Sequence, residues 1–338
     1  MNILIIKLGA IGDVIRTTSV IPGLKARYKN CKISWVTKKE SFGVLKNNSL
    51  ITNIYLIGGN IHNRLKNKKY DLVISLDDDY EACRLASEVN SKKIIGSHLK
   101  NSQKEYTKDS SLWFGMGLIS KFGKQKADAL KAKNKKTYQA IMYKILGLKY
   151  KKQEPVLILN KTELDFGKKF ALKNNIKNND LVIGINTGAG GRWEDKKLSI
   201  EKTAELMDKL NYKLQNKNIK IILFGGPEEI EKNKKIKNLV KTKIIDAGCG
   251  NSLMEFASLV NLCKVLVTSD SLALHIGVAL KKKIVCYFYP TSAQEIELYG
   301  RGKKIIWDGK SYCSYEPKCK YQPKIEIEKI INAVKKLI

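Results

Sequence analysis

The feature that most constrains the fold is an alternation of short apolar runs and helical patterns, which occurs twice along the chain. In the first half, apolar runs at residues 2–8 and 31–37 are each followed by a helical pattern. The alternation restarts at residues 180–190 and continues to a last clear apolar run at 282–290. Strands that alternate with helices form parallel βαβ units. The sequence therefore predicts an α/β fold with two Rossmann-like, doubly wound domains that face each other across a cleft.

A basic segment with a helical pattern, residues 104–152, ends the first half. A chain of 338 residues exceeds the size of most single cores, so two domains are expected. We place the first domain at residues 1–155 and the second at 156–322. Residues 323–338 have apolar positions at helical spacing and predict a terminal helix that packs back toward the first domain.

The sequence carries no signal for membrane insertion or export. No run approaches the roughly 18 apolar residues of a membrane span, and the N-terminus lacks a basic leader. The seven cysteines are odd in number, which indicates a reducing cytoplasm. Cys313 and Cys319 have three interpretations: a metal site, a redox pair, or two free thiols. We favour two free thiols.

The net charge of +31 has three interpretations. The lysines can reflect general surface usage, attraction to an anionic lipid or glycolipid, or binding of nucleic acid. No nucleic-acid recognition motif supports the third. We expect the basic segment 121–152 to lie near an anionic partner or at the joint between domains. Peripheral contact of the protein with the inner face of the cytoplasmic membrane is an open alternative.

Ligands of open α/β sheets bind at the carboxyl ends of the strands, so the residues after each strand are the candidates for a site. After the first strand comes Gly9-Ala10-Ile11-Gly12-Asp13. This spacing differs from the G-x-G-x-x-G fingerprint, which argues against NAD. Asp13 is either an N-cap of the following helix or a general base.

The turn at residues 187–199 combines several glycines with Arg192, Lys196 and Lys197. Flexible backbone and positive charge together suit a diphosphate. Lysine is common throughout this chain, so the turn by itself is a weak signal.

Two more turns in the second half carry polar residues. Glu228 and Glu229 follow Gly225-Gly226 and either stabilise a helix N-terminus or bind sugar or ribose hydroxyls. Asp270 and Ser271 precede a helical pattern that contains His275. A histidine among apolar residues is either structural or a contact to phosphate or sugar.

In the order and spacing of these motifs, the chain resembles glycosyltransferase family 9, the heptosyltransferase-like enzymes of GT-B architecture. The motifs are KLGAIGDVIRTTSVIPGLK (7–25), NTGAGGRWEDKKLS (186–199), LFGGPEE (223–229) and the segment from Thr268 to Gly300. The resemblance covers nearly the whole chain. It implies inverting, metal-independent transfer of a sugar, typically heptose, from an ADP-sugar to a hydroxyl of a glycan or glycolipid such as lipopolysaccharide core, without a cofactor.

The resemblance also implies roles for individual residues. Asp13 corresponds to the base that takes the proton of the acceptor hydroxyl. The residues expected to bind the donor are Thr187, Gly188, Lys196, Lys197, Glu228, Glu229, Asp270, Ser271 and His275. The residues expected on the acceptor side are Lys7, Gly12 and Arg16.

The chain departs from the family pattern at two positions. Leu272 stands where the family usually has glycine, and Leu198 stands where an aromatic residue is usual. A Cβ at residue 272 is expected to alter the approach of phosphates to the backbone. Transfer from another nucleotide sugar, transfer to a protein, and a non-catalytic protein that binds nucleotide or glycolipid therefore stay open as alternatives.

Overall fold

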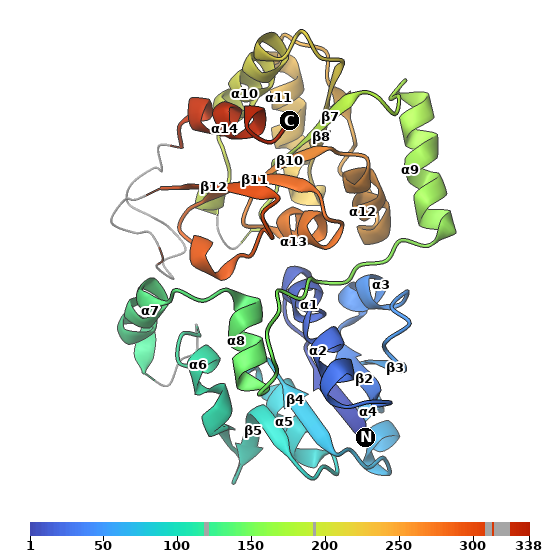
Figure 1. Cartoon of the computed structure of the whole chain (residues 1–338), viewed down its shortest axis with the longest axis vertical. Coiled ribbons are helices and arrows are strands. Elements are labelled where there is room, and N and C mark those ends of the chain that lie inside the picture. The colour runs from blue at the N-terminus through green and yellow to red at the C-terminus, as the bar shows by residue number, and fades with distance from the viewer. Residues whose placement is uncertain (118–121, 192–193, 308–312, 314–324) are drawn as a thin grey trace. The chain divides into compact units, whose positions relative to one another are not determined.

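The computed structural model describes residues 1–117, 122–191, 194–307, 313 and 325–338. The chain forms two compact units, Met1–Ile158 and Leu159–Ile338 (Figure 1). The division falls close to the boundary predicted near residue 155. Among the helices of the described residues, none has both the length and the apolar composition needed to cross a bilayer.

The first unit contains a six-stranded sheet in the order β3-β2-β1-β4-β5-β6. All neighbouring strands are parallel except β5 and β6, which are antiparallel. The strands are β1 (Asn2–Ile6), β2 (Lys32–Thr37), β3 (Asn53–Leu56), β4 (Leu72–Ser75), β5 (Ile94–Lys100) and β6 (Gln103–Tyr106). The helices are α1 (Ile11–Thr17), α2 (Val20–Arg27), α3 (Phe42–Leu45), α4 (Ile61–Lys66), α5 (Tyr80–Glu88), α6 (Ser111–Phe114), α7 (Gly123–Lys133) and α8 (Tyr138–Ile145).

The long helix predicted after β1 is two helices, α1 and α2. The hydroxyls of Thr18 and Ser19 donate to the carbonyls of Ile15 and Arg16 at the break. Pro22 has no N–H to donate to the residue four positions before it, so the first helix cannot continue through it. The break ends α1 at Thr17, one residue after Arg16, so the first helix is only seven residues long.

The second unit contains a six-stranded sheet in the order β12-β11-β10-β7-β8-β9 with parallel neighbours throughout. The strands are β7 (Leu181–Asn186), β8 (Ile219–Phe224), β9 (Ile245–Asp246), β10 (Val265–Ser269), β11 (Lys283–Phe288) and β12 (Gly302–Ile306). The helices are α9 (Lys161–Lys173), α10 (Ile200–Lys213), α11 (Ile230–Leu239), α12 (Leu253–Asn261), α13 (Leu272–Ala279) and α14 (Ile327–Lys335).

The terminal helix α14 completes the core of the second unit. Ile330, Ile331 and Val334 are fully buried in a cluster with residues of α10, α11 and the sheet. The helix contacts α10, β11 and β12. Its apolar face therefore packs within the second unit, which differs from the expectation that it would pack toward the first domain.

Strand β11 shows how the sheet of the second unit is covered on both faces. Val285 and Tyr287 belong to the cluster that includes α10 and α14. Ile284, Cys286 and Phe288 belong to a different cluster that includes residues of α13. This alternation is that of a strand between two helical layers, as in a doubly wound fold. The predicted fold class is confirmed for each unit.

Candidate active site

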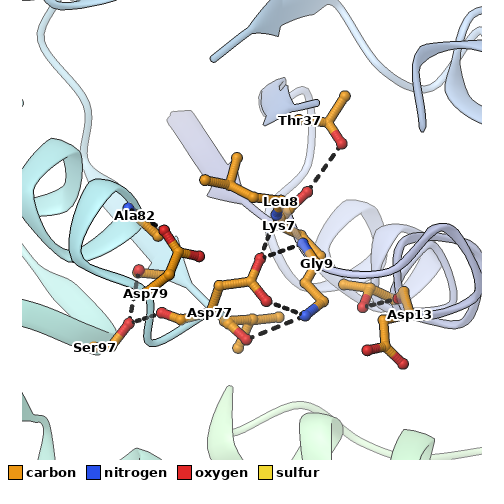
Figure 2. A network of polar contacts seen from close by, with 12 residues as sticks. Lys7, Leu8, Gly9, Asp13, Thr37, Asp77, Asp79, Ala82 and Ser97 are labelled. Atoms are coloured by element: carbon orange, nitrogen blue, oxygen red, sulfur yellow. Dashed lines mark hydrogen bonds and ion pairs between the residues drawn. The ribbon is translucent and has the colours of Figure 1, made fainter. Parts of the chain in front are cut away.

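The turn after β1 is held by a carboxylate that the sequence analysis did not single out, that of Asp77. Its Oδ2 accepts hydrogen bonds from the backbone N–H of Leu8 and of Gly9, the latter at 2.8 Å, and its Oδ1 pairs with the Lys7 ammonium (Figure 2). A Cβ on Gly9 would lie 2.8 Å from Asp77 Oδ1 and 2.9 Å from Lys7 Nζ. Glycine is therefore needed at position 9 to admit this ion pair.

Lys7 is a buried cation at the carboxyl end of β1. Its side chain is 5% exposed, and Nζ also donates to the carbonyl of Leu76 at 3.4 Å. Burial by itself would lower the pKa of Lys7, but the negative charges of Asp77 and Asp13 raise it above its usual value. Lys7 therefore remains positively charged near Asp13.

Asp13 lies in the first turn of α1, and the N-cap position is Ala10. The interpretation of Asp13 as the N-cap residue is therefore wrong. One Asp13 oxygen is 2.9 Å from a terminal nitrogen of Arg16, and the Asp13 side chain remains 33% exposed. This carboxylate is held in place and is still accessible to a substrate.

Arg16 is itself held by aromatic rings. Its guanidinium carbon lies 3.9 Å from the ring centroid of Tyr138 and 5.4 Å from that of Trp113. Stacking on rings fixes the planar cation with little loss of its charge. The structure thus brings Lys7, Asp13 and Arg16 together, whereas Gly12 is a buried position within α1.

In the second unit, Lys196 is paired with Asp270. Lys196 Nζ donates to the backbone carbonyl of Asp270 at 2.9 Å and lies 3.3 Å from its carboxylate. His275 Nε2 is 3.9 Å from the other carboxylate oxygen of Asp270. Three of the residues predicted to bind the donor therefore form one partly buried cluster.

Glu229 and Lys197 form a second pair at this edge of the sheet. Lys197 Nζ lies 2.8 Å from Glu229 Oε1, and the backbone N–H of Gly226 donates to Oε2 at 3.1 Å. A Cβ on Gly188 would lie 2.7 Å from the same Oε2. Glu229 is buried, whereas Glu228 is exposed, so the two acids of this turn have different environments.

Ser271 and Thr187 belong to hydrogen-bond networks that join neighbouring strands. The Asn186 side-chain nitrogen donates to the carbonyl of Gly188 at 2.7 Å and lies 3.3 Å from Ser271 Oγ. Thr187 Oγ1 lies 2.7 Å from Asn233 Oδ1. The sequence analysis missed Asn186 and Asn233. Asn186 is the last residue of the apolar strand β7, and Asn233 lies in α11, the helix that follows β8.

The two departures from the family pattern have different structural consequences. Leu198 is buried in the core of the second unit, where it packs with residues of α10. Leu272 is the first residue of α13 and is partly exposed. Of these two leucines, Leu272 lies at the start of a helix next to Ser271, whereas Leu198 lies in the core.

The described residues contain no group of three or more His, Cys, Asp or Glu side chains that could hold a metal ion. Cys313 is buried. Cys319 lies outside the described residues.

Comparison with known proteins identifies the family. The fold of the two units is that of the GT-B glycosyltransferases, and the profile of glycosyltransferase family 9 (heptosyltransferase) matches residues 59–325. The chain belongs to this family and is a glycosyltransferase.

Individual relatives span the full length of the chain. Lipopolysaccharide heptosyltransferase 1 of Campylobacter coli is 26% identical, with 100% of this chain and 99% of the relative aligned. A family 9 glycosyltransferase of Veillonella parvula has a TM-score of 0.79 at 19% identity, covering 99% of this chain and 96% of that one. The E. coli heptosyltransferase WaaC, solved with ADP, has a TM-score of 0.65 at 16% identity and covers 100% of both chains.

Proposed function

We propose that the protein transfers heptose from ADP-heptose to a hydroxyl of a lipopolysaccharide-type acceptor, with inversion and without a metal ion. The observation that carries this proposal is the accessible carboxylate of Asp13, held beside two cations at the carboxyl end of the β1 strand. The heptosyltransferase relative and the ADP complex of the E. coli enzyme support the choice of donor.

Asp13 acts as the general base in this proposal. The acceptor hydroxyl gives its proton to the carboxylate while its oxygen forms a bond to the anomeric carbon of the donor sugar. The bond from that carbon to the diphosphate breaks, and ADP leaves with the electron pair. Lys7 and Arg16 place positive charge beside Asp13, and a carboxylate is the form that can accept a proton.

The second unit supplies the charge that the departing diphosphate requires. Lys196 is oriented by Asp270, and Lys197 is oriented by Glu229. Cations that are already positioned stabilise negative charge as it develops, without further reorganisation. His275 and Ser271 complete the phosphate and sugar contacts in this proposal, and the exposed Glu228 is available to donor hydroxyls.

Gly188 is placed against the Glu229 carboxylate, where only glycine leaves the pair with Lys197 undisturbed. Thr187 is buried and bonded to Asn233, so we assign it to the shape of the donor turn. The position of Leu272 favours one alternative donor class, a nucleotide sugar whose phosphates do not approach the start of α13.

The experiment that tests the function compares Asp13→Asn with the wild type in ADP release and product formation. The substrates are ADP-heptose and a lipopolysaccharide-core acceptor. The variant should bind ADP-heptose with unchanged affinity and lose at least 100-fold in kcat, as expected for loss of a general base.

The matched control is Glu81→Gln, which neutralises an exposed carboxylate in the same unit. This control should retain wild-type turnover. An active Asp13→Asn enzyme would refute the assignment of Asp13. Tight binding and turnover with a different nucleotide sugar would preserve the transferase and refute ADP-heptose as the donor.

A further inference from the structure

Lysines gather at the amino edge of the sheet of the second unit, the edge where its strands begin and its helices end. The segments that form this edge are residues 173–180, 213–219, 239–244, 261–264, 280–283 and 335–338. Each contains at least one lysine, and none contains arginine. Asp180 is the one acidic residue in these stretches of sequence, and it is buried and bonded to the backbone N–H of Lys177. We call this set of segments the amino-edge surface.

The lysines crowd around one hollow in this surface. The hollow has a volume of about 600 Å³, and its walls include Lys217, Lys264, Lys281, Lys282 and Lys283. Lys282 Nζ donates to the carbonyl of Asn261 at 2.6 Å, and burial lowers the pKa of Lys282. Lys281 has a φ of 58°, a conformation that glycine adopts at lower cost. The chain therefore places lysines here although Lys282 is partly removed from water and Lys281 has a backbone conformation that glycine adopts at lower cost.

Helix dipoles explain only part of this pattern. A cation in the last turn of a helix interacts favourably with the helix C-terminus, and the effect fades beyond that turn. Lys264 and Lys281 come after the last helical residue, in short links that lead into β10 and β11, and Lys283 is the first residue of β11. Lys264 Nζ donates to the carbonyl of Asn179, and Lys283 Nζ donates to that of Leu337. A carbonyl carries only a partial charge, so an anionic partner would interact more strongly with these lysines.

Large apolar side chains project from the same edge. Leu172, Tyr212 and Leu239 lie in the last turns of α9, α10 and α11, and they are 77%, 70% and 50% exposed. Exposed apolar side chains interspersed with lysines are typical of surfaces that enter the headgroup region of a bilayer.

We propose that the amino-edge surface binds the anionic phospholipid surface of a membrane. Lysine is a flexible point charge that suits mobile headgroups, whereas arginine would be favoured for fixed, bidentate recognition of phosphate. A nucleic-acid partner would also favour aromatic rings in position to stack on bases, and Tyr212 is the one aromatic residue among the exposed side chains named above.

This inference does not depend on the identity of the donor or acceptor. The strand β7 is six residues long, so the carboxyl edge of this unit lies roughly 20 Å from its amino edge. A protein bound through the amino-edge surface would therefore keep the proposed donor residues of this unit in water, open to a soluble nucleotide sugar.

The test is co-sedimentation of the full chain with vesicles, in the absence of any donor. Phosphatidylcholine vesicles are compared with vesicles that contain about one third phosphatidylglycerol. We expect binding to the anionic vesicles that weakens as salt is raised. The variant Lys264→Gln/Lys281→Gln/Lys283→Gln should partition on the order of 100-fold more weakly, and Leu172→Ser/Tyr212→Ser should also bind more weakly.

The competing basic surface is α7, in the segment 121–152, and Lys124→Gln/Lys126→Gln/Lys133→Gln removes three of its exposed lysines. This variant should bind as the wild type does. Loss of binding in the α7 variant with full binding by both amino-edge variants would overturn the proposal, as would equal binding to neutral vesicles. Preference for duplex DNA over anionic vesicles at equal salt would assign the surface to nucleic acid instead. Circular dichroism of each variant confirms that it is folded.

Discussion

Lys232 donates a hydrogen bond from its ammonium to the backbone carbonyl of Leu198 at 2.6 Å. This contact ties the first turn of α11 to the segment that carries Lys196 and Lys197. Burial, together with the nearby charge of Lys197, lowers the pKa of Lys232 to about 8, although Glu229 acts in the opposite direction. One cation of the second unit therefore titrates close to physiological pH.

The stability of the wild type should depend on pH through Lys232. Between about pH 8 and the usual lysine pKa of 10.5, the unfolded chain binds a proton that the folded chain has released. The free energy of unfolding contributed by this group therefore rises with pH in that window. Urea unfolding of the wild type and Lys232→Met should show their difference shifting in favour of the wild type as pH rises through the window. A difference that is constant with pH would contradict the lowered pKa.

Asp77→Ala should be strongly destabilising. The substitution leaves the buried ammonium of Lys7 without its main partner and frees the N–H groups of Leu8 and Gly9. Loss of one partner of a buried ion pair costs about 3–5 kcal/mol. Denaturant unfolding measures this cost directly.

The double variant Lys7→Met/Asp77→Leu tests the origin of that cost. Replacing both charges by apolar side chains removes the unpaired buried ion, so the double variant should be more stable than Asp77→Ala. It should nevertheless lose transfer activity, because one of the two cations near Asp13 is gone. Equal destabilisation of the two variants would show that the backbone contacts of Asp77, and not the charge, dominate.

Gly9→Ala should disturb the same turn by a steric route. The added methyl group would lie within 3 Å of both Asp77 Oδ1 and Lys7 Nζ, and relief requires one of them to move. The expected loss of stability is about 1–3 kcal/mol, with lower kcat/KM. Gly250→Ala is the matched control, because no atom lies within 4 Å of a Cβ at that position, and it should unfold like the wild type.

Leu272→Gly tests whether the side chain at the start of α13 hinders binding of the donor. Removing the side chain exposes the backbone beside Ser271, so the affinity for ADP-heptose should increase if the leucine hinders the phosphates. Glycine in the helix should lower stability by up to about 1 kcal/mol relative to a residue with a Cβ. Calorimetric titration with ADP and ADP-heptose gives the first quantity. An unchanged or weaker affinity would mean that Leu272 does not face the donor.

The sequence was sufficient to predict the two α/β units, because buried parallel strands leave long apolar runs such as residues 2–6 and 181–186. It did not reveal β6 or β12. Strand β6 is polar and mostly exposed, and β12 contains two lysines within five residues. Edge strands of this kind have no hydrophobic signal, and their pairing is fixed by neighbours that are distant in sequence or by a turn.

The sequence also did not reveal which residues form hydrogen bonds and ion pairs with the predicted site residues. Asp77 lies in a run of three acids after β4, and nothing in that run distinguishes the residue whose carboxylate meets Leu8 and Gly9, about 70 positions earlier. The separation of Glu228 from Glu229 likewise depends on which one the turn directs inward. Motif spacing selected turns that the structure places at the carboxyl ends of strands, whereas the individual partners required the packed structure.

The antiparallel strand β6 affects how prone the chain is to aggregate while it folds. Asn101 and Ser102 both have positive φ, 50° and 62°, as a two-residue hairpin turn requires. The turn folds a short strand with the sequence Gln-Lys-Glu-Tyr back over the last parallel strand. Parallel sheets assemble slowly, and an unpaired apolar edge can recruit a strand from another molecule during that time. A charged hairpin forms from adjacent residues and closes that edge early, so β6 helps keep newly made copies of this lysine-rich protein from aggregating with one another.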